Sequence, residues 1–147
     1  MNAFIRRFAW PVLLGLLLPA AAGAQGVLHK GNVTIRYNAV PASALPAQSA
    51  SQLGVEHTSG QGLLNVMVST GQGDDAPGVA ADVNARATTG NGTPVPIHVR
   101  EIREANGVSY MGTFRIRQTG TLRFDLDVTP PGAATQHIQF THTFVVD

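Results

Sequence analysis

The stretch YMGTFRIRQTGTLRFDLDV, residues 110–128, decides the fold that we expect for this chain. Apolar residues occupy every second position on both sides of Gln118-Thr119-Gly120. Such alternation places apolar side chains on one face of a strand and polar side chains on the other. We therefore expect two antiparallel strands joined by a three-residue loop, with Phe114 paired opposite Phe124.

A second turn, Asn106-Gly107, precedes this stretch. It is typical of a two-residue type I′ hairpin, because both central residues of that turn need positive φ. Such a turn sets Val99 opposite Phe114 and Ile102 opposite Met111. A register one residue away would turn the apolar side chains to the wrong face, so the pattern predicts the pairing as well as the strands.

Working outward from these hairpins, alternation recurs along the whole chain after the first 30 residues, whereas no long segment has helical periodicity. Seven segments alternate in this way: residues 33–37, 64–68, 79–87, 95–99, 110–116, 122–128 and 138–146. The fold class predicted is all-β, a single antiparallel immunoglobulin-like β-sandwich of about seven strands. Residues 41–54, which contain two prolines, should cross the end of the sandwich instead, and the last strand should form a sheet edge.

The first 24 residues have the features of a cleavable signal peptide. Arg6-Arg7 precedes an apolar run at residues 9–18, and Ala22-Gly23-Ala24 has the small residues that signal peptidase accepts. The apolar run is shorter than the roughly 20 residues of a membrane span. We expect a signal peptide at residues 1–24, cleavage after Ala24, and a β-sandwich domain at residues 25–147 with no stable membrane anchor.

The composition of the remaining chain excludes some partners. Loss of Arg6 and Arg7 with the leader leaves eight basic residues against nine acidic ones, a net charge of −1. A nucleic-acid-binding protein would need a basic patch, so we expect no nucleic-acid partner. The chain contains no cysteine, so neither a disulfide nor a lipid on a mature N-terminal cysteine is available, and the core alone must hold the domain.

Several short motifs together resemble those of domain-of-unknown-function family 4426, small exported proteins of Gram-negative bacteria. In chain order the motifs are Tyr37-Asn38-Ala39, Leu45-Pro46, Leu63-Leu64-Asn65-Val66, Arg100-Glu101-Ile102-Arg103-Glu104, Thr113-Phe114-Arg115-Ile116 and Leu122-Arg123-Phe124. The resemblance covers almost all of the chain after the leader. It implies an all-β fold and a soluble periplasmic protein, and it carries over no activity and no catalytic residue.

The residues themselves give little sign of catalysis. The sequence has no cysteine nucleophile, no G-x-S-x-G elbow, no H-E-x-x-H and no phosphate-binding glycine loop. Asp125 and Asp127 share one face of a strand, and Arg123 beside them with Arg115 across the expected hairpin explains them as ion pairs on a solvated face. We therefore expect a protein that is not an enzyme and has no catalytic residue and no cofactor.

Metal binding is the alternative hypothesis. The histidines and the two methionines after the leader are ligand types that suit copper. Met67, Met111 and His142 are the weak candidates for metal ligands. His142 has the inward parity of its strand, however, where a core histidine with a hydrogen-bond partner is the commoner finding.

An interaction surface is the leading hypothesis. Ile102 and Met111 lie on the outer side of their expected hairpin, and Met67 has the outer parity of its own strand. An exposed apolar patch of these three residues would mark a binding surface, unless residues 41–54 cover it. The sequence thus favours a non-catalytic protein-interaction or binding module whose partner is another periplasmic protein, and the final strand could accept a strand from that partner.

Overall fold

A computed structural model of the chain describes residues 24–147 except residues 72, 74 and 106. The predicted signal peptide, apart from Ala24, therefore lies outside the described residues. The elements follow one another as β1 (Ala24–Lys30), β2 (Val33–Pro41), a 3₁₀ turn η1 (Ala42–Ala44), α1 (Ala47–Leu53), β3 (Gln61–Thr70), β4 (Asp82–Thr89), β5 (Pro94–Val95), β6 (His98–Glu104), β7 (Gly107–Arg115), β8 (Gly120–Thr129) and β9 (Gln136–Phe144).

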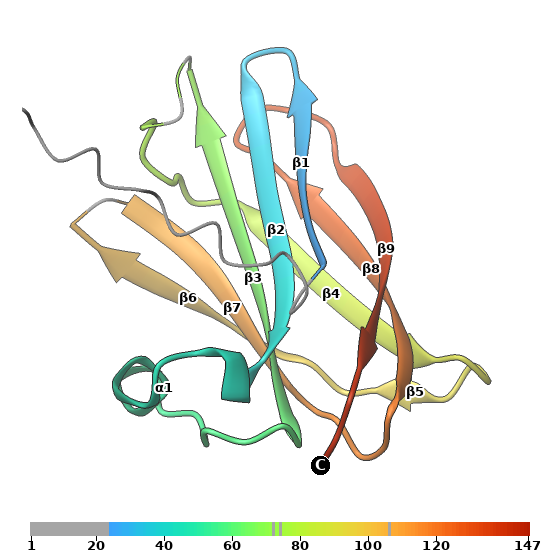
Figure 1. Cartoon of the computed structure of the whole chain (residues 1–147). Helices are drawn as coiled ribbons and strands as arrows, with labels where there is room; N and C mark the ends of the chain where they lie inside the picture. Colours follow the sequence, from blue (N-terminus) through green and yellow to red (C-terminus); the bar gives the residue numbers. More distant parts are fainter. Residues whose placement is uncertain (1–23, 72, 74, 106) are drawn as a thin grey trace, which may run out of the picture.

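The strands form two antiparallel sheets that pack face to face (Figure 1). Sheet A has the order β1-β2-β3-β7-β6, and sheet B has the order β5-β4-β8-β9. The predicted all-β sandwich is confirmed, with nine strands in the described part of the chain instead of about seven. The expectation that the last strand is an edge is also confirmed, because β9 ends the order of sheet B.

The core lies between the sheets and is built from the alternating residues that the sequence pattern singled out. Ile35, Val66 and Val68 of sheet A and Leu126 and Val128 of sheet B have at most 1% of their surface exposed. Most of their polar neighbours in the chain are at least partly exposed, although Ser69 is buried, so burial of the apolar face favours the strand conformation here.

Phe114 and Phe124 correct one predicted register. β7 and β8 belong to different sheets, so these residues are not cross-strand partners. Their rings nevertheless meet edge to face across the core, with centroids 5.4 Å apart. The expected three-residue hairpin is instead a connection from sheet A to sheet B. Apolar faces meet in a sandwich core as well as within a sheet, so the alternation is equally compatible with both arrangements.

The hairpin of β6 and β7 corrects the other register. Val99 pairs with Gly112 instead of Phe114, and Ile102 pairs with Ser109 instead of Met111. The pairing is offset by two positions, which leaves every side chain on the face that was predicted.

Gly107 and Gly78 explain why the pairing of β6 with β7 is offset by two positions. Gly107 pairs with Glu104 and has a φ of 118°, and a Cβ on it would come within 2.5 Å of the backbone of Gly78. Gly107 therefore lies inside β7, where another segment approaches closely, and is not a central residue of the turn.

The segment between β4 and β7 changes sheets. Pro94-Val95 pairs with β4 in sheet B, and from His98 onward the chain pairs with β7 in sheet A. Proline has no N–H to donate, and Pro96 stands where the chain leaves sheet B. The segment 95–99, predicted as one strand, is thus the crossover between the two sheets.

Residues 41–54 cover the outer face of sheet A rather than only the end of the sandwich. Ala42, Ala50 and Val55 pack with Leu63 and Met111 in a second apolar cluster. The helix α1 ends at Gly54, which adopts the left-handed conformation with a φ of 71°. The Arg100 side chain donates a hydrogen bond to the carbonyl of Leu53 and so ties the end of the helix to β6.

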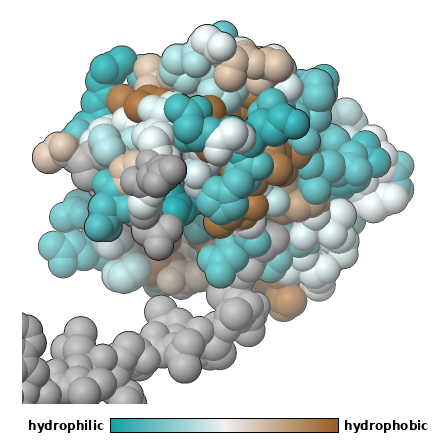
Figure 2. Space-filling model, turned by 90° about the horizontal axis from the view of Figure 1, so that it is seen from above, coloured by the Kyte–Doolittle hydropathy of each residue, from teal (hydrophilic) through white to brown (hydrophobic). Residues whose placement is uncertain are grey.

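At the other end of the sandwich, Tyr110 links the two sheets. Its hydroxyl accepts a hydrogen bond from the backbone N–H of Ala81, 2.8 Å away, just before β4 begins. The same hydroxyl lies 3.4 Å from Oε1 of Glu101 on β6 and donates to it. Figure 2 views this end, and it shows hydrophobic residues in the middle between hydrophilic ones at the rim. Tyr110 is 8% exposed, so it closes the core at this end.

Candidate functional site

The expected apolar patch is largely covered. Met111 is buried, with 4% of its surface exposed, in the cluster under residues 41–54. Ile102 is partly buried against the same cluster. These two residues therefore do not form an open apolar surface, and the covering segment is the one that the sequence offered as the alternative.

Met67 lies apart from this cluster. It is half-buried on the outer face of sheet A, and a Cβ added at Gly78 would lie 3.1 Å from its Cγ. Gly78 is held between β3 and β7 by bridges to Ser69 and Gly107. The Met67 side chain therefore packs under this segment, and the three predicted patch residues do not make one exposed surface.

The predicted metal ligands are not brought together either. Met67 and Met111 lie on the outer face of sheet A, whereas His142 lies on the inward side of β9 in sheet B. Sheet A separates the methionines from the histidine. Within the described ranges, no group of three or more His, Cys, Asp or Glu side chains could hold a metal ion.

His142 lies on β9, an edge strand of sheet B, and its ring packs against another aromatic ring. Its ring meets that of Phe144 edge to face with centroids 4.5 Å apart, and burial lowers its pKa. The imidazole is consequently kept neutral, which agrees with a core position.

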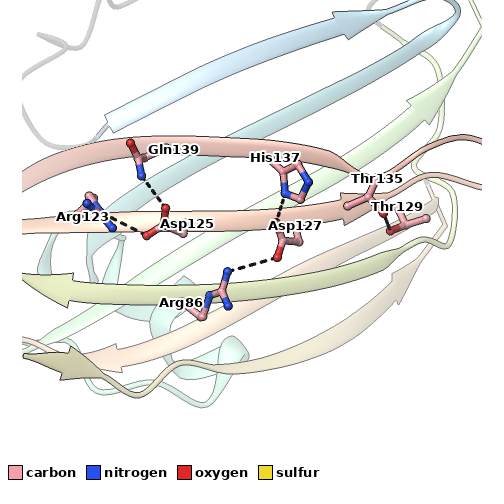
Figure 3. A network of polar contacts seen from close by, with 8 residues as sticks. All are labelled: Arg86, Arg123, Asp125, Asp127, Thr129, Thr135, His137 and Gln139. Carbon is pink, nitrogen blue, oxygen red and sulfur yellow. Dashed lines mark hydrogen bonds and ion pairs between the residues drawn. The ribbon is translucent and has the colours of Figure 1, made fainter.

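Asp125 and Asp127 lie in a network of polar contacts on the outer face of sheet B (Figure 3). Asp125 lies 3.3 Å from Arg123, and Asp127 lies 3.4 Å from Arg86 and also contacts His137. The ion-paired surface predicted for these carboxylates is present. Arg115 is not part of it, because β7 belongs to the other sheet.

A cavity of about 750 Å³ lies where the chain crosses between the sheets, and we call it the crossover pocket. It is enclosed by the turn between β4 and β5, the start of β6, the end of β7 and the connection to β8, at the end of the sandwich near β5 and the C-terminus (Figure 1). Its floor contains the buried residues Phe114, Ile116 and Leu122 and the half-buried Val95. Ligand sites in proteins typically have about 300–1,000 Å³ and mostly apolar walls, and this pocket has both properties.

The rim of the crossover pocket is polar and basic. Arg115, Arg117 and His98 line it together with threonine, asparagine and glutamine side chains, and no aspartate or glutamate is among the described residues of its lining. The exposed arginines alternate with the buried Phe114 and Ile116 along the chain, and all four residues line the pocket because they lie where β7 ends.

Sequence reasoning missed this pocket. Its lining comes from three stretches of the chain, which are Gln61, residues 89–98 and residues 113–122, and they meet where residues 94–98 change sheets. The one local signal was the pair of prolines at 94 and 96, which disfavours a continuous central strand.

Comparisons with known proteins agree with the fold. A crystal structure of a DUF4426 family protein, PA0388 from Pseudomonas aeruginosa PAO1, superposes with a TM-score of 0.68 at 27% identity, covering 84% of this chain and 96% of that one. A copper-bound variant of FetP from uropathogenic Escherichia coli strain F11 gives a TM-score of 0.56 at 9% identity, covering 86% and 98%. "As isolated" FetP from the same strain gives 0.52 at 10%, covering 84% and 96%.

No curated protein matches the chain. The family model for the domain of unknown function DUF4426 matches residues 28–147, which is almost all of the part described in the structure. The chain therefore belongs to the DUF4426 family.

Proposed function

We propose that this protein is a non-catalytic binding module of the periplasm and that the crossover pocket is its binding site. The observation that carries the proposal is the pocket itself. It has a volume of about 750 Å³ and is lined by both apolar and polar residues. A concave pocket that combines apolar surface with a few polar groups is the usual form of a small-molecule binding site.

The polar residues elsewhere support binding over catalysis. The carboxylates of sheet B are paired with arginine or histidine side chains on a solvated face. The half-buried His142 packs against an aromatic ring. Ion pairing at the surface explains these carboxylates, and packing explains this histidine. A catalytic role is not needed to account for their positions.

A neutral fluorescent probe tests the proposal. N-Phenyl-1-naphthylamine should bind the protein purified from the periplasm with one-to-one stoichiometry and increased fluorescence. Val95→Trp should abolish the signal, because the indole fills the pocket from its wall. Val27→Trp, at an exposed position of β1, is the matched control and should bind as the wild type does. Absence of saturable binding, or binding unaffected by Val95→Trp, would refute the assignment of the site.

A copper-binding protein is the second candidate. FetP in its copper-bound form has a similar fold, and this similarity is the reason for considering copper here. In this chain Met67, Met111 and His142 lie on opposite sides of sheet A, so they cannot share one ion. We expect Cu(I) titration against a competing chelator to show less than one tightly bound equivalent. One tight equivalent that is lost in Met67→Leu or His142→Gln would favour copper over our proposal.

The periplasmic setting belongs to the proposal and rests on the predicted signal peptide. No helix in the described part of the chain is long and apolar enough to cross a membrane. Intact-mass measurement of the protein from the periplasmic fraction should give a chain that begins at Gln25. A full-length chain in the membrane fraction would contradict both the cleavage and the location.

A further inference from the structure

The two arginines that line the crossover pocket differ from three other arginines in the described part of the chain. Arg86, Arg103 and Arg123 each lie within 3.4 Å of a carboxylate oxygen. Within residues 24–147 as the structure describes them, Arg115 and Arg117 have no carboxylate partner. Two guanidinium groups and an imidazole thus face one cavity whose described lining contains no acidic residue.

This distribution of charged residues favours an anionic ligand. A guanidinium binds a carboxylate through charge-assisted hydrogen bonds, which are about twice as strong as neutral ones. Beneath the arginines, Phe114, Ile116 and Leu122 offer apolar surface, and each Å² of apolar ligand surface removed from water contributes roughly 25 cal/mol. A cation bound here would be repelled by Arg115 and Arg117. A purely polar ligand would make no contact with the apolar residues of the pocket.

We propose that the crossover pocket binds a small amphipathic acid, with its apolar chain on the floor of the pocket and its single carboxylate at Arg115 and Arg117. This inference rests on the proposed function and deepens it by naming the ligand class. The concave shape and the closeness of floor and rim suit a free small molecule, since both parts of the ligand are bound within one cavity.

Displacement of N-phenyl-1-naphthylamine compares ligands that differ only in the headgroup. Dodecanoate should displace the probe at a concentration about tenfold lower than 1-dodecanol does, with all ligands kept below their micelle concentrations. Dodecyltrimethylammonium should be weaker than the alcohol. The preference for the acid should shrink as salt is raised, because exposed charges are screened over about 10 Å at 0.1 M ionic strength.

Variants assign the preference to the two arginines. The double change Arg115→Gln and Arg117→Gln should make dodecanoate and dodecanol displace the probe at similar concentrations, which is a loss of the roughly tenfold preference for the acid. Both side chains are exposed and lack ion pairs, so the fold should tolerate the change. Arg86→Gln, which removes an exposed arginine from the outer face of sheet B, is the control and should keep the preference.

The outcomes separate the two proposals. Probe binding with equal displacement by acid and alcohol would overturn the ligand class and leave the binding site intact. A preference that survives the double variant would also overturn it, because the charge would then come from elsewhere. Absence of probe binding would overturn the proposed function and this inference together.

Discussion

Replacement of Phe124 by leucine tests the packing that joins the two sheets. The ring is completely buried, and its centroid lies 4.8 Å from that of Phe140, 5.4 Å from that of Phe114 and 6.3 Å from that of Phe144. Aromatic pairs contribute about 0.5–1.5 kcal/mol each beyond the area they bury. Three pairs give an upper range of about 1.5–4.5 kcal/mol, and because leucine retains part of the contact we expect a loss of about 2 kcal/mol.

Urea denaturation followed by far-ultraviolet circular dichroism measures this loss, since the only tryptophan, Trp10, lies in the predicted signal peptide. The midpoint should fall with an unchanged slope, and the melting temperature should fall by roughly 8 °C for a domain of this size. Val27→Ala, at a residue 51% exposed, should change the free energy of unfolding by less than about 0.5 kcal/mol. A Phe124→Leu variant within that same margin would refute the aromatic packing described for this ring.

Two further changes test particular contacts. Gly62→Ala should destabilise the domain by about 1–3 kcal/mol in the same assay, because a Cβ there would lie 2.3 Å from the ring of Phe114, whereas Gly60→Ala should be nearly neutral because its nearest neighbour is 3.7 Å away. Equal effects of the two would contradict the placement of the ring. His142 has its pKa lowered from 6.5 by burial, so the unfolded chain binds its proton more readily. The free energy of unfolding should therefore fall as the pH drops from about 6.5 towards the lowered pKa, and His142→Gln should reduce this dependence; identical pH profiles would count against the burial.

The faces of the strands could be predicted from the sequence, because burial on one side imposes a period of two. Val66, Val68, Phe114 and Phe124 all point inward as the alternation requires. The outer ion pairs of Asp125 were predicted for the same reason. Alternation shows whether a side chain is buried or exposed. It does not show which sheet the strand belongs to, because both sheets have one buried face.

The neighbours of the strands could not be predicted in this way. A hairpin between β7 and β8 and a crossing between the sheets place Phe114 beside Phe124 equally well, so a local pattern does not distinguish them. β1 was missed because residues 24–30 adjoin the leader and lack strict alternation. The offset at Gly107 depends on Gly78, which is distant in the sequence and comes close only in the folded domain.

The candidate site was beyond sequence reasoning for a similar physical reason. Arg115 was interpreted as an ion-pair partner for a neighbouring strand, but the chain leaves sheet A after Arg115, and the residue lines a cavity instead. Met111 was assigned correctly to the outer face, but only the fold shows that residues 41–54 cover it. A cavity is a property of packing between distant segments, and no motif marks it.

The pairing of β3 with β7 and of β4 with β8 also determines when the domain can fold. The central strands of each sheet are about 40 residues apart in the sequence, so sheet A cannot be completed before β7 is made, and sheet B cannot be completed before β9 is made. Folding through such distant contacts is slow, because the chain loses loop entropy before native contacts form. A newly made chain therefore lacks the central pairing of both sheets through most of its synthesis.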